Sequence, residues 1–370
     1  MKKILFVVES MSGGGAEKVL FNIVKNLDKK KYAITVYTVV KTGVYINELQ
    51  KYCNIKYGLK NYQEYSFLGK LFYKLKYRFI YSANTKIVYK FLIRCNYDIE
   101  IGFVEGFSTK LVANSLNKKS KKYAWVHTDM DINNYADSYY ETLEEHKRCY
   151  KHYNKVICVS KQALNQYERK FNLHNSIVIY NPIDTEGLKY YKKDFILEDK
   201  IKLCVIGRLE YQKGFDRLIH TLDDLKKFDF ELSIIGTGSE EYKLKELVKN
   251  YGLENKICFT GFLTNPYEIM ANSNLIICSS RSEGYSLVVA EGICLGIPIL
   301  TTNCTGPSEL IDNGKFGIIV ENSLSGLKNG LLTVFDNPFI LKKFHVLSTQ
   351  RASIFGINQA IKEIEAIFDE

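Results

Sequence analysis

The stretch KILFVVESMSGGGAEKVLFNIVKNL, Lys3 to Leu27, decides the fold class of this chain. Its apolar run, Ile4–Val8, is typical of a buried strand, and Glu9 ends the run too early for a signal-peptide core or a membrane span. Three glycines follow, and the residues from Ala16 to Leu27 have the spacing of an amphipathic helix. A strand, a tight turn and a helix in this order form the repeating unit of α/β folds.

The same alternation continues to the end of the chain. Four further strand-like runs lie in the first half: AITVYTVV, DIEIGFV, KYAWVH and KVICVS. The alternation is interrupted at NPIDTEG, Asn181–Gly187. Six more strand-like runs follow: KLCVIGR, FELSIIG, KICFTG, NLIICSS, IPILTT and FGIIV. We therefore expect two doubly wound, parallel-sheet domains of the Rossmann-like type, residues 1–183 and 184–354, which face a central cleft. The closing helix, 355–370, is expected to pack back onto the first domain.

Composition fits a globular, reduced protein. The chain has 370 residues, 46% of them hydrophobic and 25% charged, which excludes a disordered chain. Nine cysteines occur without a C-x-x-C pair, so we expect thiols in a cytoplasmic protein. The net charge is +10, and the segment Lys60–Lys122 holds most of it, with 13 Lys and Arg against 4 Asp and Glu. This segment suits an anionic partner: nucleic acid, acidic lipid headgroups or a phosphorylated acceptor.

One part of the basic segment has a helical apolar face. In SFLGKLFYKLKYRFIY, Ser66–Tyr81, six apolar residues share that face: Phe67, Leu68, Leu71, Phe72, Leu75 and Phe79. Two interpretations are open. The helix lies on an anionic membrane surface, or it packs on the core and exposes a basic back. A nucleic-acid partner is disfavoured, because no known binding module is present.

Three segments carry residues suited to phosphate and sugar chemistry. In Ser12–Lys18 the glycines let the backbone approach a ligand at a helix N-terminus, although a plain tight turn explains them as well. In GRLEYQKGFDRL, Gly207–Leu218, Arg208 and Lys213 follow a strand and are able to neutralise a diphosphate, unless they form a solvated surface pair.

The third segment is SSRSEGYSLVVAEGICLGIP, Ser279–Pro298, where a strand leads through a polar loop to a helix that starts near Ser286. The amides of Ser286 and Leu287 suit phosphate. Glu291 lies within an apolar helix and needs a partner there, for which sugar or ribose hydroxyls are suitable. Glu283 has the same chemistry, but capping of local backbone competes as an explanation.

Five motifs in this order resemble the family-4 retaining glycosyltransferases, which have the two-domain GT-B fold. They are GGGAEK near the start, WVHTD at Trp125–Asp129, NPID at the hinge, GRLEYQKG, and EGYSLVVAE with seven residues between its glutamates. They span nearly the whole chain, and together they are specific. Lys18, where an arginine is common, and Gly292 and Cys294, where alanines are usual, depart from the pattern.

The resemblance implies roles for matching residues. Arg208 and Lys213 bind the donor diphosphate, Glu283 contacts the transferred sugar, Glu291 holds the ribose, and His127 bonds outer sugar hydroxyls. Gly14 and Gly15 match the loop that closes over phosphate or acceptor, and Gly207, Ser286 and Leu287 belong to the donor-binding motifs. Gly261 and Phe262 lie in the segment TGFL, Thr260–Leu263, where the base is gripped.

The resemblance also implies an activity. We expect retaining transfer of a hexose or N-acetylhexosamine from a nucleotide-diphosphate sugar, with uridine as base, to a saccharide or lipid-linked acceptor in bacterial surface polysaccharide synthesis. The first domain is expected to bind the acceptor and the second the donor. No cofactor or metal is expected, because no Asp-x-Asp motif occurs in a fitting loop. The alternatives are a nucleotide-sugar epimerase of the same fold and a non-catalytic nucleotide-sugar-binding protein. The expected location is cytoplasmic, at the inner face of the cell membrane if residues 66–81 bind it.

Overall fold

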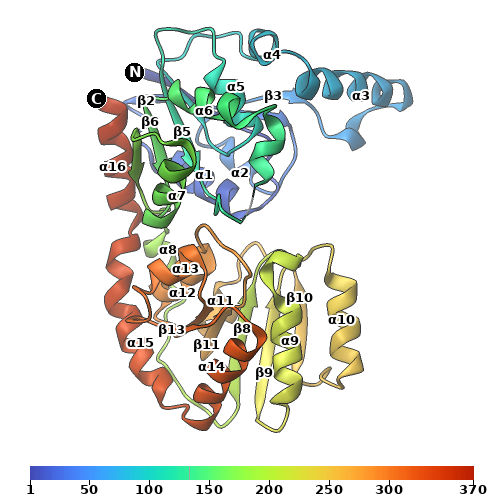
Figure 1. The fold of residues 1–370 in the computed structure, drawn as a ribbon, viewed down its shortest axis with the longest axis vertical. Coiled ribbons are helices and arrows are strands. Elements are labelled where there is room, and N and C mark those ends of the chain that lie inside the picture. Colours follow the sequence, from blue (N-terminus) through green and yellow to red (C-terminus); the bar gives the residue numbers. More distant parts are fainter. Residues whose placement is uncertain (133) are drawn as a thin grey trace. The chain divides into compact units, whose positions relative to one another are not determined.

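The computed structural model describes residues 1–132 and 134–370. The chain divides into two compact units: unit 1 is Met1–Pro182 with Ile357–Glu370, and unit 2 is Ile183–Gly356. Each unit holds one parallel sheet with helices around it (Figure 1). The prediction of two Rossmann-like, parallel-sheet domains is therefore confirmed. The predicted boundary follows residue 183, and the observed division follows Pro182.

Unit 1 is built on a seven-stranded sheet in the order β3-β2-β1-β4-β5-β6-β7. Its strands are β1 (Lys2–Val8), β2 (Tyr32–Val40), β3 (Asn54–Leu59), β4 (Ile99–Gly102), β5 (Lys121–Val126), β6 (Lys155–Cys158) and β7 (Ser176–Val178). The two edge strands, β3 and β7, do not appear among the predicted runs. Polar Asn54 and Lys56 interrupt the apolar residues of β3, and β7 is only three residues long, so neither was recognised as a strand-like run.

The helices of unit 1 connect these strands. They are α1 (Gly15–Asn26), α2 (Ile46–Leu49), η1 (Tyr62–Glu64), α3 (Phe67–Ser82), α4 (Thr85–Leu92), α5 (Phe107–Ala113), η2 (Tyr135–Tyr139), α6 (Leu143–Lys151), α7 (Lys161–Phe171) and α16 (Ile357–Asp369). The last of them comes from the end of the chain and packs against the first strands. The Phe368 ring contacts those of Tyr32 and Tyr123, and the Tyr123 hydroxyl donates to the Ile367 carbonyl.

Unit 2 is built on a six-stranded sheet in the order β10-β9-β8-β11-β12-β13. Its strands are β8 (Ile201–Ile206), β9 (Phe230–Ile235), β10 (Ile257–Gly261), β11 (Leu275–Cys278), β12 (Ile299–Thr302) and β13 (Ile318–Val320). Its helices are α8 (Thr185–Lys189), η3 (Tyr211–Lys213), α9 (Phe215–Asp224), α10 (Glu241–Asn250), α11 (Tyr267–Ala271), α12 (Leu287–Leu295), α13 (Thr305–Leu310), α14 (Leu324–Asp336), α15 (Ile340–Arg351) and η4 (Ala352–Phe355).

Strand order fixes where a ligand site is favoured in each unit. In unit 1, β2 pairs with one side of β1 and β4 pairs with the other side. In unit 2, β9 and β11 pair with the two sides of β8 in the same arrangement. Such a switch point opens a crevice beyond the carboxyl ends of the two strands. The candidate sites are therefore expected after β1 and β4, and after β8 and β11. Among the described residues, every helix is too short or too polar to span a bilayer.

Candidate active site

In unit 2, the switch point brings Lys213 and Glu283 together. Lys213 ends the short helix after β8, and Glu283 lies in the loop after β11. The Lys213 ammonium donates to Glu283 Oε1 and forms an ion pair with it. Burial opposes the charged form of Lys213, but the attraction of the Glu283 carboxylate outweighs burial and raises the pKa of Lys213. Lys213 is therefore cationic at neutral pH.

The backbone holds Lys213 in this position. Its side chain crosses the face of Gly207, where an added Cβ would lie 3.3 Å from Lys213 Cε. The Ser279 hydroxyl donates to the Lys213 carbonyl at 2.9 Å, which ties the lysine to the end of β11. Gly214 follows with a φ of 67° and turns the chain into α9. The glycines on both sides of the lysine thus have structural roles that serve its placement.

Arg208 is the second cation of this crevice. It follows β8 by two residues, it is exposed, and it makes no ion pair with any described residue. Its charge opposes protonation of Lys213, so the two positive groups are close enough to repel each other. A fold that holds two like charges together at a strand end is suited to an anion that relieves the repulsion.

Glu283 is largely buried, with an exposed fraction of 8%. Its Oε1 accepts from the Ser280 hydroxyl at 3.0 Å as well as from Lys213, and its carbonyl accepts from the amide of Gly306 at 2.9 Å. Among the described residues, the hydrogen bonds to the carboxylate all reach Oε1, which leaves Oε2 available to a ligand hydroxyl. Both donors to this carboxylate are side chains, so it does not cap local backbone amides, which was the competing explanation.

The helix α12 begins directly after the glutamate loop. Ser286 is its N-cap and accepts from the Val289 amide at 3.4 Å, so the first-turn amide of Leu287 lies at the positive end of the helix dipole. Glu291 is 4% exposed within this helix, and the Tyr267 hydroxyl of α11 donates to its Oε1 at 3.2 Å. The helix is packed tightly: a Cβ on Gly292 would lie 2.6 Å from the Ile276 side chain.

Gly261 and Phe262 lie farther along the same sheet. Gly261 ends the edge strand β10 with a φ of 73°, and Phe262 is 44% exposed. β9 lies between β10 and β8, so these two residues stand two strands away from Arg208. An exposed ring beside a glycine is able to stack on a planar ligand.

In unit 1, the predicted glycines lie at the start of α1. Gly14 is the N-cap, and a Cβ there would lie 2.4 Å from Glu17 Oε2. An acidic side chain in the first turn occupies the positive end of the helix and repels a second anion. The Glu17 carboxylate therefore counts against a phosphate at Gly14 and Gly15.

His127 follows β5, and one ring nitrogen is already used. Its Nε2 lies 2.9 Å from the Phe103 carbonyl, so Nε2 carries the hydrogen and Nδ1 is the acceptor. Burial lowers the pKa of His127, while the charge of Glu105 acts in the opposite direction. The neutral ring thus offers an acceptor for a hydroxyl rather than a positive charge.

Two glutamates of unit 1 were missed by the sequence analysis. Glu105 follows β4, is fully buried, and accepts through Oε1 from the His127 amide at 2.7 Å and from the Thr128 amide at 2.8 Å. Its Oε2 is buried without a hydrogen-bond partner among the described residues. Glu9 follows β1 and accepts from the hydroxyls of Tyr81 and Tyr139. A carboxylate directly after a predicted strand was the signal that could have identified both.

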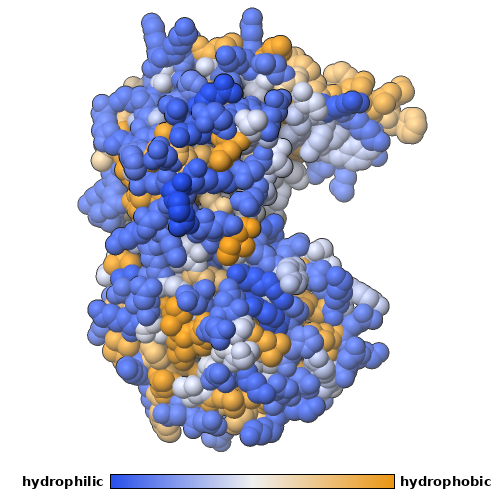
Figure 2. Space-filling view, in the orientation of Figure 1, coloured by the Kyte–Doolittle hydropathy of each residue, from blue (hydrophilic) through white to orange (hydrophobic). Residues whose placement is uncertain are grey.

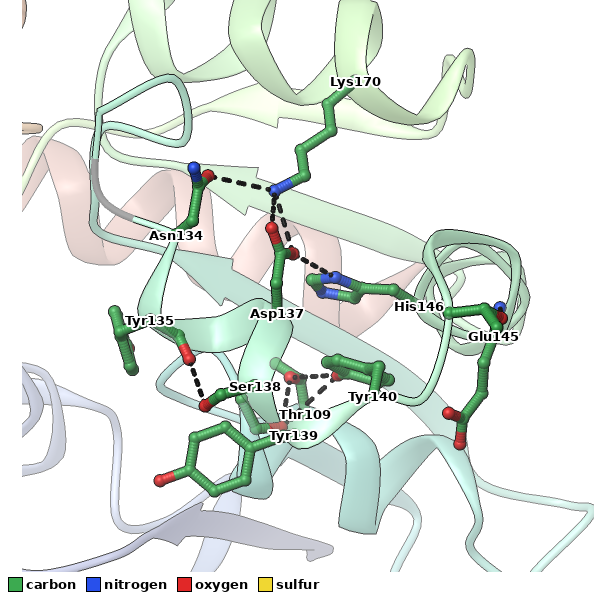
Figure 3. Close-up of polar contacts among 12 residues, drawn as sticks. Thr109, Asn134, Tyr135, Asp137, Ser138, Tyr139, Tyr140, Glu145, His146 and Lys170 are labelled. Carbon is green, nitrogen blue, oxygen red and sulfur yellow. Dashed lines mark hydrogen bonds and ion pairs between the residues drawn. The ribbon is translucent and has the colours of Figure 1, made fainter.

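Burial raises the pKa of Glu9, although the bonds from Tyr81 and Tyr139 act against burial. The loop that carries Tyr139 is held by a partly buried polar cluster (Figure 3). In this cluster Asp137 accepts from Lys170 at 2.7 Å and lies 2.9 Å from His146 Nδ1. The loop that carries Tyr139 is thus anchored to α6 and α7.

A cavity of about 1000 Å³ opens beside this loop. Its walls come from the end of α3, the start of α4, and from α5 and α6, and Tyr81 and Tyr139 line it. Both tyrosines also donate to Glu9, so these two wall residues link the cavity to the residue that follows β1. It has the size of a site for a small saccharide.

Comparison with known proteins covers both units. The model of the family described as Glycosyltransferase Family 4 matches residues 13–187, and that of Glycosyl transferases group 1 matches residues 189–348. An uncharacterized glycosyltransferase of Haemophilus influenzae is 29% identical over 377 residues, covering 99% of this chain and 100% of the relative. An N-acetylgalactosaminyltransferase of Campylobacter jejuni, which acts on a diphospho-undecaprenol-linked saccharide by its name, is 28% identical, with 96% of each chain covered.

A third relative is the amylovoran biosynthesis glycosyltransferase AmsD of Erwinia amylovora, at 24% identity with 98% of each chain covered. Among solved structures, Anabaena Alr3699/HepE in complex with UDP and glucose superimposes with a TM-score of 0.76 at 18% identity, covering 100% of both chains. The lipopolysaccharide outer core galactosyltransferase WaaB gives a TM-score of 0.70 at 18% identity, with 99% of both chains covered. At this identity, these structures establish the fold.

Proposed function

The chain belongs to the family-4 glycosyltransferases of group 1, and from this premise we propose that it transfers a hexose or N-acetylhexosamine from a UDP-sugar to a saccharide or lipid-linked acceptor. The single observation that carries the proposal is the Lys213–Glu283 pair beside Arg208 at the β8/β11 switch point. The relatives named for amylovoran and for a diphospho-undecaprenol-linked saccharide support a role in bacterial surface polysaccharide synthesis.

The donor diphosphate meets three sources of positive charge in this proposal. Lys213 has three N–H donors and gives one to Glu283, so others remain for phosphate oxygens. Arg208 supplies a planar fork, and the first-turn amides of α12 supply aligned dipoles. Negative charge grows on the leaving phosphate as the sugar bond breaks, and groups already in place stabilise it without reorganisation. The reaction we propose therefore needs no divalent metal.

The two buried glutamates recognise the hydroxyls of the donor. Glu283 Oε2 accepts from a hydroxyl of the transferred sugar, while Oε1 stays on Lys213 and Ser280. Glu291 accepts from the ribose, and Phe262 covers the base. Because both carboxylates accept hydrogen bonds from hydroxyl groups, they distinguish sugars by the direction of each hydroxyl and not by charge.

Unit 1 supplies the acceptor side in this proposal. Neutral His127 accepts from an outer hydroxyl of the sugar through Nδ1, and the segment around Gly14 and Gly15 closes over the acceptor. Transfer with retained configuration follows when the acceptor attacks from the face of the leaving phosphate, which then takes the acceptor's proton. The nine free thiols support a cytoplasmic location, with the acceptor reached at the inner face of the membrane.

The first test is a thermal-shift panel of nucleoside diphosphates and UDP-sugars without added metal. We expect the largest shift with UDP-linked ligands, and we expect Arg208→Ala and Lys213→Ala to abolish it. Lys226→Ala, which changes an exposed lysine of the same unit, serves as the control and keeps the shift. A folded protein that no nucleotide stabilises would contradict the proposal.

Product analysis separates the remaining activities. Incubation with a UDP-sugar and an acceptor is expected to give UDP and an α- or β-linked product whose anomeric configuration, read by NMR, matches that of the donor. Conversion of the UDP-sugar to its epimer without an acceptor would identify an epimerase instead. Binding with neither product would identify a nucleotide-sugar-binding protein.

A further inference from the structure

The helix α3 leaves its apolar side chains in the open. Phe67 is 90% exposed and Leu68 is 78% exposed, and three further side chains of this face, Leu71, Phe72 and Leu75, are each 62% exposed. The one buried residue of the helix is Ile80. The interpretation of residues 66–81 as a core-facing helix is therefore wrong. Figures 1 and 2 show α3 extending from the sheet of unit 1 with apolar side chains along it.

The opposite side of α3 attaches the helix to unit 1. A row of tyrosines, Tyr73, Tyr77 and Tyr81, runs along that side at helical spacing, with adjacent ring centroids 5.8 and 4.7 Å apart. The Tyr81 ring packs on Phe107, and Lys76 donates to the Gly58 carbonyl at 2.7 Å. At about 100° per residue, the exposed apolar residues cover an arc of about 140° on the side away from these contacts.

The next helix extends the same surface. In α4, Ile87 is 59% exposed and Phe91 is 43% exposed, while Val88 and Tyr89 face the core. The Phe91 ring lies 5.5 Å from that of Phe79 in an edge-on contact, so the two helices share one apolar surface. We call this surface the α3–α4 face; its exposed apolar members are Phe67, Leu68, Leu71, Phe72, Leu75, Phe79, Ile87 and Phe91.

Charge identifies what the α3–α4 face meets. Between Ser66 and Arg94 there are seven Lys and Arg residues and no Asp or Glu. A second copy of the chain would pair this surface with itself and set like charges opposite each other. A nucleic acid would leave the apolar side chains without a partner. An anionic lipid surface satisfies both features, because its headgroups attract the cations and its acyl boundary takes up the apolar side chains.

We propose that the α3–α4 face docks on an anionic lipid bilayer, with α3 lying in the plane of the surface. At 16 residues the helix is about 24 Å long, and its apolar side enters the headgroup region while its lysines remain at headgroup level. The inference rests on the proposed function, since a lipid-linked acceptor is held in such a surface. The cavity beside Tyr81 adjoins the C-terminal end of α3, so docking brings the headgroup region next to the acceptor side of unit 1.

The test uses the full chain and vesicle flotation. Vesicles of phosphatidylcholine alone are compared with vesicles that also contain phosphatidylglycerol. We expect binding to the anionic vesicles that weakens as salt rises. Leu71→Glu with Phe72→Glu is expected to weaken binding on the order of a hundredfold, because two anchors are lost and two negative charges are added. Lys70→Gln with Lys74→Gln is expected to weaken it roughly 25-fold, or about fivefold for each lysine.

Matched controls lie elsewhere on unit 1. Leu116→Glu changes another exposed apolar residue, and Lys118→Gln with Lys119→Gln removes two exposed lysines. Both are expected to bind vesicles within about twofold of the unchanged chain. Equal binding to neutral and anionic vesicles, or equal losses in the controls, would overturn the proposal. So would a chain that ignores vesicles and changes from dimer to monomer on Leu71→Glu with Phe72→Glu.

The UDP thermal shift keeps this inference separate from the proposed function. The donor residues lie in unit 2, so every α3 variant is expected to keep the shift. Vesicle binding without any nucleotide shift would uphold the docking surface and refute the transferase. A nucleotide shift without vesicle binding would refute the docking surface and leave the donor site of the proposed function standing.

Discussion

At the residue scale, the Lys213–Glu283 pair is the most informative contact. In Glu283→Gln, Lys213 keeps its burial and the repulsion of Arg208 but loses the carboxylate, so its pKa falls. We expect kcat to fall by roughly a hundredfold or more, and the KM for the donor to change little, because the diphosphate replaces the carboxylate as partner of Lys213. Steady-state kinetics measures both. Glu254→Gln, at an exposed glutamate, is the control, and an unchanged kcat in Glu283→Gln would refute the role.

Glu105 is expected to act as a positioning residue for His127. It accepts from the amides of His127 and Thr128 and from the Thr128 hydroxyl. In Glu105→Ala these donors lose their acceptor, and we expect the free energy of unfolding, measured in urea, to fall by about 1–3 kcal/mol. We also expect a raised KM for the sugar substrate that His127 binds. Glu105→Gln keeps an acceptor at the Oε1 position and should restore most of both. Equal damage in the two variants would show that the charge, not the acceptor, is required.

His146 makes unit 1 sensitive to acid. Burial lowers its pKa to about 4, although its bond to Asp137 acts against burial. A neutral buried histidine contributes fully above its unfolded pKa of about 6.5, and its contribution is lost as pH falls from there to about 4. We expect about 2–3 kcal/mol to be lost in this window, shared with Asp137, Lys170 and Glu145 around the ring. His146→Gln, followed by urea unfolding at several pH values, should flatten the dependence; an unchanged slope would refute it.

At the element scale, α12 is constrained by its packing on β11 and β12. A Cβ on Gly292 would lie 2.6 Å from Ile276 Cδ1 and 2.8 Å from Ile299 Cδ1, both ends of flexible side chains. We expect Gly292→Ala to stay within about 1 kcal/mol of the unchanged chain, since helix propensity offsets a small shift. Gly292→Leu should cost about 1–3 kcal/mol or more and weaken UDP binding by moving Ser286. Thermal melts with and without UDP check this, and a tolerated leucine would contradict it.

Secondary-structure prediction succeeded where the environment of an element is set locally. The buried strands β1, β4, β8 and β11 were predicted from their apolar runs, and the helix after Gly14 was predicted from the helical spacing of its apolar residues. The same period placed a helix over residues 66–81 but could not tell whether its apolar side faces protein or solvent, because amphipathicity is the same in both cases. The strands β3 and β7 were missed, because Asn54 and Lys56 interrupt β3 and β7 is only three residues long.

At the scale of the whole molecule, the end of the chain completes unit 1. Phe368 is 1% exposed between Tyr32 and Tyr123, at the far end of the sequence from β1. We expect Phe368→Ala to destabilise unit 1 by about 3–5 kcal/mol, and Lys362→Gln, at an exposed position of α16, to have no measurable effect. The fluorescence of Trp125, the one tryptophan of the chain, reports the unfolding of unit 1. The UDP thermal shift reports the folded state of unit 2. Equal loss of both signals in Phe368→Ala would show that the units unfold together.

The sequence by itself determined the two parallel-sheet domains and the family, because the strand and helix periods and the five motifs are local patterns that do not depend on tertiary contacts. It also gave the candidates Arg208, Lys213, Glu283 and Glu291 from their places after strands and within α12. Tertiary structure decided the rest. It paired Lys213 with Glu283, 70 residues apart, and joined Glu9 to Tyr81 and Tyr139. It also showed that the apolar side of α3 faces solvent. Side-chain pairing and burial depend on contacts between distant segments, and no local sequence pattern records such contacts.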